Sequence, residues 1–235
     1  GGGYGNYCYG AHGTVTGGSS NWLGPAHSLI GGGASNYVYS YTGIINGGQS
    51  NIAYGSWSTI QGGYSNAAAS TWSHVGGGYD NYAGGESSVV GGGWYNVAQY
   101  HGYIGGGHSN EQYASYSVIG GGYDNLIYNA HARIGGGQYN YLNGYSDSIG
   151  GGSYNSAYGS WSTVGGGVSN VAGTTWTVVL GGYDNGAYDT RATVGGGQYN
   201  RANTDWATTA GGYGNYVYSY SGTVSGGKSN TYGRN

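Results

Sequence analysis

The sequence predicts an all-β protein, a parallel β-solenoid or β-roll of sixteen 15-residue coils, in a single repeat domain spanning residues 1–235. Three observations lead to this fold class. The chain repeats every 15 residues, 58 of its 235 residues are Gly, and each repeat contains short segments that alternate as strands do. Helices are disfavoured because each interior Gly costs about 1 kcal/mol relative to Ala.

The clearest mark of the repeat is an Asn that follows Gly-Gly-x-x in every unit. Successive Asn residues are 15 positions apart, except for the step of 14 between Asn96 and Asn110. The sixteen positions are Asn6, Asn21, Asn36, Asn51, Asn66, Asn81, Asn96, Asn110, Asn125, Asn140, Asn155, Asn170, Asn185, Asn200, Asn215 and Asn230. Equivalent positions stack in a solenoid, so we expect a structural ladder of amide side chains. Asn also tolerates the left-handed backbone conformation, which predicts that each Asn lies at a turn.

Two columns of small or β-branched residues predict the core. In residues 150–164 the last five positions alternate, so Ser162 and Val164 face one side, and Trp161 and Thr163 face the other. The position of Val164 holds Val or Ile in nearly every unit and is expected inside the coil. A second column, which contains Ala157, marks another short extended segment. Each coil is therefore predicted to contain two strands and two turns.

The paired Gly residues predict turns with unusual backbone geometry. Gly is needed where φ is positive or where another backbone approaches closely. The 14-residue unit at 91–104 is one residue short. We expect this unit to shorten the turn near Gln99–His101 without breaking the Asn ladder.

Aromatic residues form two further columns, and strand alternation predicts that both point outward. The chain has 30 Tyr and 7 Trp but no Phe. Candidate interface or glycan-stacking residues in these columns are Tyr39, Tyr54, Trp57, Trp72, Tyr158, Trp161, Trp176 and Trp206. One buried Val or Ile contributes about 1.5–3 kcal/mol, whereas ordering a coil costs roughly 15–30 kcal/mol of backbone entropy. We therefore expect these aromatics to be buried in a homo-oligomer, either a side-by-side trimer or an end-to-end filament.

The sequence offers little for catalysis, and we expect no enzyme activity, no catalytic residues, no metal site and no cofactor. Asp80, Asp124 and Asp184 recur at one turn position without a partner carboxylate. His12 and His27 share a column, which is more typical of a solvent-facing pair than of a metal site. The net charge of -3, with five cations, disfavours nucleic acid as a partner. Membrane insertion is not expected because no run of about 18 apolar residues occurs.

The repeat resembles a known family. The unit from Asn51 to Ile60 reads Asn-x-Ala-x-Gly-x-x-Ser-x-Ile, and the unit from Asn155 to Val164 follows the same pattern. This pattern resembles the head repeats of YadA-like trimeric autotransporter adhesins, and similar glycine-rich repeats occur in some bacteriophage fibres. The resemblance implies a left-handed β-roll of three chains with an adhesive surface outside the cell. The repeat departs from the family in its usual length of 15 rather than 14 residues and in its heavier Gly and Tyr content.

The leading functional hypothesis is a non-enzymatic structural and adhesive fibre element that is extracellular, on a cell surface or on a virion. Its expected partner is itself. An alternative is a carbohydrate-binding solenoid that stacks surface glycans on the Trp and Tyr columns. A second alternative is an ice-binding protein, which needs a regular Thr face. The Thr column that includes Thr59 and Thr163 is interrupted by His74, Arg133 and Val178.

Overall fold

The computed structural model describes residues 2–233, and every regular element within them is a β-strand of two residues. The parallel strands stack as a β-solenoid, which confirms the predicted fold class. The chain divides into two compact units, one that ends at Tyr116 and one that begins at Ser117. That residues 1–235 form one repeat domain stays a prediction. No helix among the described residues has the length and apolarity needed to cross a membrane.

The first unit contains two parallel sheets. In the first sheet the strands follow the order β1 (Tyr7–Cys8), β3 (Trp22–Leu23), β5 (Tyr37–Val38), β7 (Ile52–Ala53), β9 (Ala67–Ala68), β11 (Tyr82–Ala83), β13 (Val97–Ala98) and β15 (Glu111–Gln112). In the second sheet they follow the order β2 (Thr14–Val15), β4 (Leu29–Ile30), β6 (Ile44–Ile45), β8 (Thr59–Ile60), β10 (His74–Val75), β12 (Val89–Val90) and β14 (Tyr103–Ile104).

The second unit has the same build. One sheet consists of β17 (Leu126–Ile127), β19 (Tyr141–Leu142), β21 (Ser156–Ala157), β23 (Val171–Ala172), β25 (Gly186–Ala187), β27 (Arg201–Ala202), β29 (Tyr216–Val217) and β31 (Thr231–Tyr232). The other consists of β16 (Val118–Ile119), β18 (Arg133–Ile134), β20 (Ser148–Ile149), β22 (Thr163–Val164), β24 (Val178–Val179), β26 (Thr193–Val194), β28 (Thr208–Thr209) and β30 (Thr223–Val224).

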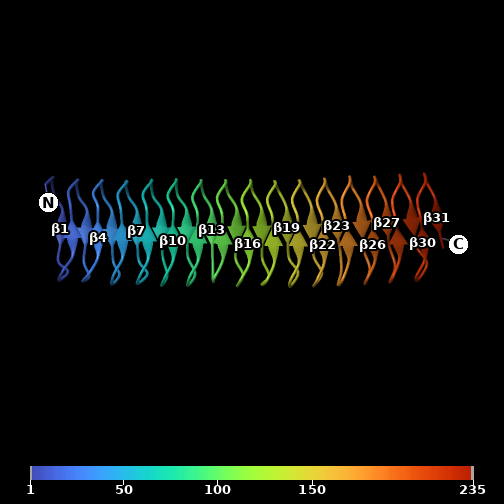
Figure 1. The fold of residues 1–235 in the computed structure, drawn as a ribbon, viewed down its shortest axis with the longest axis horizontal. Helices are drawn as coiled ribbons and strands as arrows, with labels where there is room; N and C mark the ends of the chain where they lie inside the picture. Colours follow the sequence, from blue (N-terminus) through green and yellow to red (C-terminus); the bar gives the residue numbers. More distant parts are fainter. Residues whose placement is uncertain (1, 234–235) are drawn as a thin grey trace. The chain divides into compact units, whose positions relative to one another are not determined.

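Within each unit the register is one coil per step. Thr59 in β8 pairs with His74 in β10, and Tyr141 in β19 pairs with Ser156 in β21. Figure 1 shows the strand arrows of successive coils in a row, with the connecting turns above and below them. Each coil also makes a third parallel contact, an isolated bridge two residues before the Asn, as between Tyr64 and its equivalent one coil later. Sequence reasoning predicted two strands per coil and missed this third ladder.

The Val and Ile column forms the core, as predicted. The side chains of Ile60, Ile119 and Val164 are fully buried, and so is Ala157 in the second column. The strands are shorter than the five-residue alternation suggested. Trp161 is not a strand residue but lies in a turn with φ 58°, although its side chain points outward as expected.

The unit at 91–104 shortens its turn where the sequence predicted. Four residues separate β13 from β14, whereas five separate β11 from β12. The amide of Gly102 donates to the carbonyl of Gln99 across the shortened turn, at 2.7 Å. The amide of Asn110 still donates to Oδ1 of Asn96, at 3.1 Å, so the ladder is unbroken.

The Gly-Gly turns meet both conditions that require Gly. Gly63 has φ 92°, and a Cβ there would lie 2.1 Å from the carbonyl oxygen of Gly78. The expectation that Asn supplies the left-handed residue was wrong. The residue before it has this role, as Ser65 does before Asn66, with φ 54°. Asn66 is the residue directly before β9, and its side chain is fully buried.

Candidate functional site

The Asn side chains form a buried column of hydrogen bonds. The amide and Nδ2 of Asn66 donate to Oδ1 of Asn51, at 2.9 and 3.2 Å. The same Nδ2 also lies 3.0 Å from the carbonyl oxygen of Gly62 and 2.9 Å from that of Gly78. Oδ1 of Asn66 accepts from the amide and Nδ2 of Asn81. Each amide therefore stabilises its own turn, the next turn and the next Asn, and leaves no polar atom for chemistry.

The column continues through each unit. From Asn21 to Asn110 in the first unit, every amide donates to Oδ1 of the preceding Asn at 2.9–3.1 Å. From Asn140 to Asn230 in the second unit, the corresponding distances are 3.0–3.1 Å. No Asn in these two series differs from its neighbours in the way that a catalytic residue would. We therefore assign a structural role to the Asn column.

The predicted Trp column lies on the turn between the two strands of a coil. We call this column, with its equivalents in the other coils, the Trp edge. Its five Trp side chains, Trp57, Trp72, Trp161, Trp176 and Trp206, are between 45% and 57% exposed. All five have φ of 56–61°. Rings of successive coils stack, as Trp161 and Trp176 do with centroids 5.5 Å apart and planes 14° apart. Leaving such a stack of apolar indole rings exposed to water is energetically unfavourable.

The predicted Tyr column also points outward. Tyr39 and Tyr54 stack with centroids 5.2 Å apart and planes 9° apart. Tyr158 packs against Tyr141, with centroids 5.6 Å apart. About half of each side chain of Tyr39, Tyr54 and Tyr158 stays exposed. That another chain shields these residues stays a prediction.

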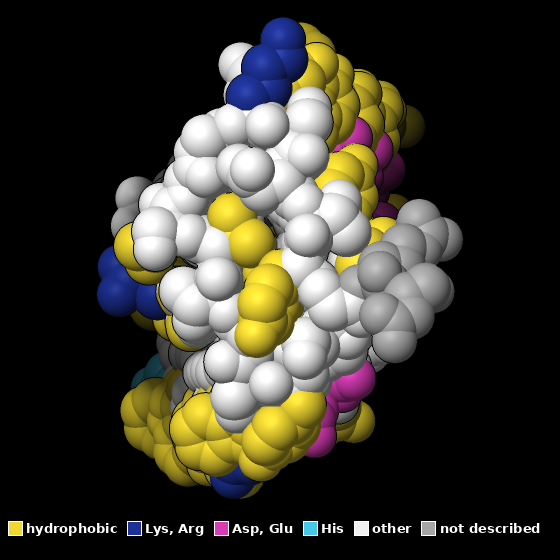
Figure 2. All heavy atoms as spheres, turned by 90° about the vertical axis from the view of Figure 1, so that its right-hand side faces the viewer, with side chains coloured by type: hydrophobic (Ala, Val, Ile, Leu, Met, Phe, Trp, Pro, Cys, Tyr) yellow, Lys and Arg dark blue, Asp and Glu magenta, His cyan; other side chains and the backbone are white. Residues whose placement is uncertain are grey.

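A second aromatic edge was missed by sequence reasoning. The two variable positions of Gly-Gly-x-x-Asn hold Tyr or Trp in many coils, and we call this turn the Gly-Gly edge. Tyr139 and Tyr154 stack there with centroids 4.8 Å apart, and Tyr79 meets Tyr95 edge to face at 5.3 Å. Figure 2, which views the second unit from its C-terminal side, shows hydrophobic side chains gathered at two separate edges. The signal was present in the sequence as Tyr at x positions of the repeat.

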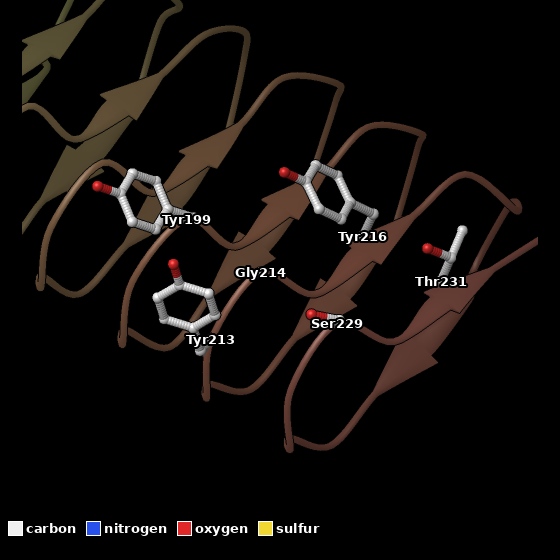
Figure 3. Close-up of a pocket in the computed structure, with 6 residues that line it drawn as sticks. All are labelled: Tyr199, Tyr213, Gly214, Tyr216, Ser229 and Thr231. Carbon is white, nitrogen blue, oxygen red and sulfur yellow. The ribbon is translucent and has the colours of Figure 1, made fainter.

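A hollow opens on the Gly-Gly edge over Gly214. Its volume is about 400 Å³, and Tyr199, Tyr213, Gly214, Tyr216, Ser229 and Thr231 line it. Figure 3 shows the three Tyr rings around the bare backbone at Gly214, with Ser229 and Thr231 on the adjacent coil. None of the six residues is an Asp, Glu, Lys, Arg or His. The hollow therefore combines aromatic walls with hydroxyl groups and carries no formal charge.

A second hollow on the Gly-Gly edge is more apolar. Tyr79, Trp94, Tyr95 and His108 line a volume of about 280 Å³ in the first unit. The ring of Tyr95 meets that of His108 edge to face, with centroids 5.7 Å apart. Oγ of Ser109 lies 2.9 Å from Nδ1 of His108. This hollow offers ring surface and few polar groups.

Acidic residues are scattered across the two units. Asp184 has φ 49° in its turn and forms an ion pair with Arg201, with the carboxylate and guanidinium atoms 2.5 Å apart. A side-chain hydrogen bond with Asp189 raises the pKa of Asp205 above its ordinary value. His12 and His27 stack with centroids 5.0 Å apart. No group of three or more His, Cys, Asp or Glu within residues 2–233 is arranged to hold a metal ion.

One carboxyl group is buried. Asp147 is 1% exposed and occupies a core-facing position that holds Ser in several other coils. Its Oδ1 accepts from the amide of Ser162 at 2.8 Å, and its Oδ2 has no partner. Burial raises its pKa to about 7, against the opposing effect of the backbone amides of Ser162 and Gly144. The group belongs to the core and has no access to a substrate.

Comparison of the chain with protein-family models and with curated protein sequences finds no match.

Proposed function

We propose that this chain is a non-enzymatic structural element of an extracellular, cell-surface or virion fibre, and that it associates with further copies of itself through the Trp edge and the Tyr column. The observation that carries the proposal is the repetition of half-exposed aromatic side chains at fixed positions of a regular scaffold. Removing such a surface from water is favourable by about 25 cal/mol for each Å² of apolar area.

A second copy of the chain is the partner that best matches this surface. Aromatic groups recur at the same repeat positions in many of the coils, so a copy in register presents rings at the same spacing. Charged residues make up 6% of the sequence, and like-charge repulsion between copies is correspondingly small. The resemblance of the repeat to YadA-like head repeats supports a side-by-side trimer, and a filament is the other arrangement that the repeat allows.

The ice-binding alternative has less support from the side chains. Ladders of Thr hydroxyls need long uninterrupted runs, and the longest run within the described strands is Thr193, Thr208 and Thr223 in β26, β28 and β30. In the first unit, Thr59 pairs with Ile44 on one side and His74 on the other.

Electron microscopy and sedimentation of the purified chain test the proposal. We expect trimers or filaments in the wild type. The double variant Trp161→Ser with Trp176→Ser should abolish them, because Ser occupies the same left-handed turn position at Ser146 and Ser221 and preserves the turn.

The matched control removes two rings from the other edge. Tyr139→Ser with Tyr154→Ser places Ser where other coils already have it, as at Ser169. This control should assemble like the wild type. A wild type that stays monomeric at all concentrations contradicts the proposal, and so does equal loss of assembly in both double variants.

A further inference from the structure

We propose that the hollow over Gly214 binds one pyranose ring of a neutral glycan. This inference stands apart from self-association, because the hollow lies on the Gly-Gly edge and shares no residue with the Trp edge or with the Tyr column.

The hollow lies where a coil of the second unit lacks a side chain. Gly214 occupies the position before Asn215, where the other coils of this unit carry a larger residue such as Tyr199 or Ser229. A Cβ at Gly214 would meet no atom nearer than Oγ of Ser229, at 3.8 Å. The backbone keeps the conformation of the column, with φ 64° at Gly214 and 58° at Tyr199. Gly214 is the residue without a side chain in this column of the second unit, and it leaves a gap that a ligand can occupy.

The walls of the hollow suit a sugar ring. Tyr199 and Tyr213 meet with ring centroids 5.5 Å apart and planes 78° apart, so they form a corner, and Tyr216 stands beside Gly214 (Figure 3). Aromatic faces are electron-rich and attract the partly positive C–H groups on the flat face of a pyranose. The volume of about 400 Å³ lies near the lower end of the range for small-molecule sites, about 300–1,000 Å³. That size suits one sugar unit of a longer chain.

The polar groups of the hollow suit sugar hydroxyls. The lining includes the side-chain hydroxyls of Tyr213, Tyr216, Ser229 and Thr231. Each hydroxyl can both donate and accept, as can each hydroxyl of a sugar. Lys228 lies over the Tyr213 ring with Nζ 5.6 Å from the centroid and is not part of the lining. The absence of charge in the lining favours a neutral sugar over a sialic acid or a phosphate.

The test uses a glycan array and ligand-observed NMR with neutral hexoses and N-acetylhexosamines at millimolar concentration, and with sialic acid for comparison. Gly214→Tyr should reduce binding at least tenfold. The new ring fills the hollow, while the left-handed turn accepts Tyr, as it does at Tyr154 and Tyr199. Tyr213→Gln should also weaken binding, because Gln occupies the same column at Gln198.

The matched control is Ser169→Tyr, which adds the same side chain at the same column position away from the hollow. It should bind as the wild type does, and circular dichroism should show all three variants folded. Failure of every neutral sugar to bind overturns the proposal. So does binding that survives Gly214→Tyr, or that is confined to sialic acid. The Trp161→Ser with Trp176→Ser variant separates the two proposals, since it should lose assembly and keep sugar binding.

Discussion

The guanidinium carbon of Arg191 lies 4.6 Å from the ring centroid of Trp176 and covers its face. On the next coil the ring centroid of Trp206 lies 4.7 Å from the same carbon. Arg191 therefore occupies, between two indoles, the place that a third Trp would fill in this column. A planar cation between two aromatic faces continues the stack and adds electrostatic attraction to each ring.

Replacing Arg191 should loosen this part of the Trp edge without unfolding the coil. Arg191→Ser is expected to lower the free energy of unfolding of the second unit by about 1–2 kcal/mol, since each exposed cation–π contact contributes about 0.5–1 kcal/mol. Ser is compatible with the turn because Ser221 has the same left-handed backbone. Thermal unfolding followed by Trp fluorescence measures the effect. Arg191→Lys should lose less, and an unchanged melting curve for Arg191→Ser would show that the sandwich adds no stability.

Asn66→Ala should be strongly destabilising. The substitution removes the acceptor for the amide and Nδ2 of Asn81 and the donor to the carbonyls of Gly62 and Gly78. Buried groups left unpaired cost about 1–3 kcal/mol each, so we expect a loss of roughly 3–6 kcal/mol in the free energy of unfolding. Denaturant unfolding measures this loss.

Asn230→Ala is the control, because Asn230 is exposed and water can replace its hydrogen bonds. This variant should lower the free energy of unfolding by about 1 kcal/mol. Equal losses in the two variants would contradict the structural role of the buried ladder.

Two adjacent glycines should respond in opposite ways to the same substitution. Gly48 has φ 89°, and a Cβ there would lie 2.2 Å from the carbonyl oxygen of Gly63. Gly48→Ala should therefore lower the free energy of unfolding by more than about 3 kcal/mol or prevent folding. A Cβ at Gly47 meets no atom within 4 Å. Gly47→Ala should change stability by less than about 1 kcal/mol and can be stabilising through the unfolded state. The expression level and melting temperature of the two variants test this prediction. Similar behaviour of both variants would refute the explanation that the backbone of the next coil lies too close for a Cβ.

Asp147 should make the second unit less stable as the pH rises. Its pKa is about 7 in the folded state, against the ordinary value of 3.8 that the carboxyl group has in the unfolded chain. The unfolded chain therefore loses the proton first, and the free energy of unfolding falls between about pH 4 and pH 7 and then levels off. The difference corresponds to at most about 4 kcal/mol. Asp147→Ser restores the residue found at Ser162 and should remove this decline. Denaturant unfolding at a series of pH values measures it, and a decline that persists in Asp147→Ser would point to another group.

The buried half of the structure followed from the sequence because it repeats. One column holds Val or Ile at the position of Ile60, and another holds Asn at the position of Asn66. Equivalent residues of successive repeats can contact one another only if the coils stack. The shortened turn near Gln99 could be predicted because the unit at 91–104 has 14 residues instead of 15. The Asn backbone was predicted wrongly, because residue preference alone does not tell whether the left-handed residue is Asn66 or Ser65. That choice depends on which side chain must point inward.

The coil length, the inward Val and Ile column and the outward direction of Trp161 could all be predicted from the amino-acid sequence. These properties depend on periodicity, which is visible without coordinates. The folded structure was needed to show that the strands are two residues long, that the Gly-Gly edge carries a second set of rings and that a hollow opens over Gly214. It also placed Arg191 between Trp176 and Trp206. These features depend on backbone dihedral angles and on what neighbouring coils leave unfilled, and a single repeat unit does not contain that information.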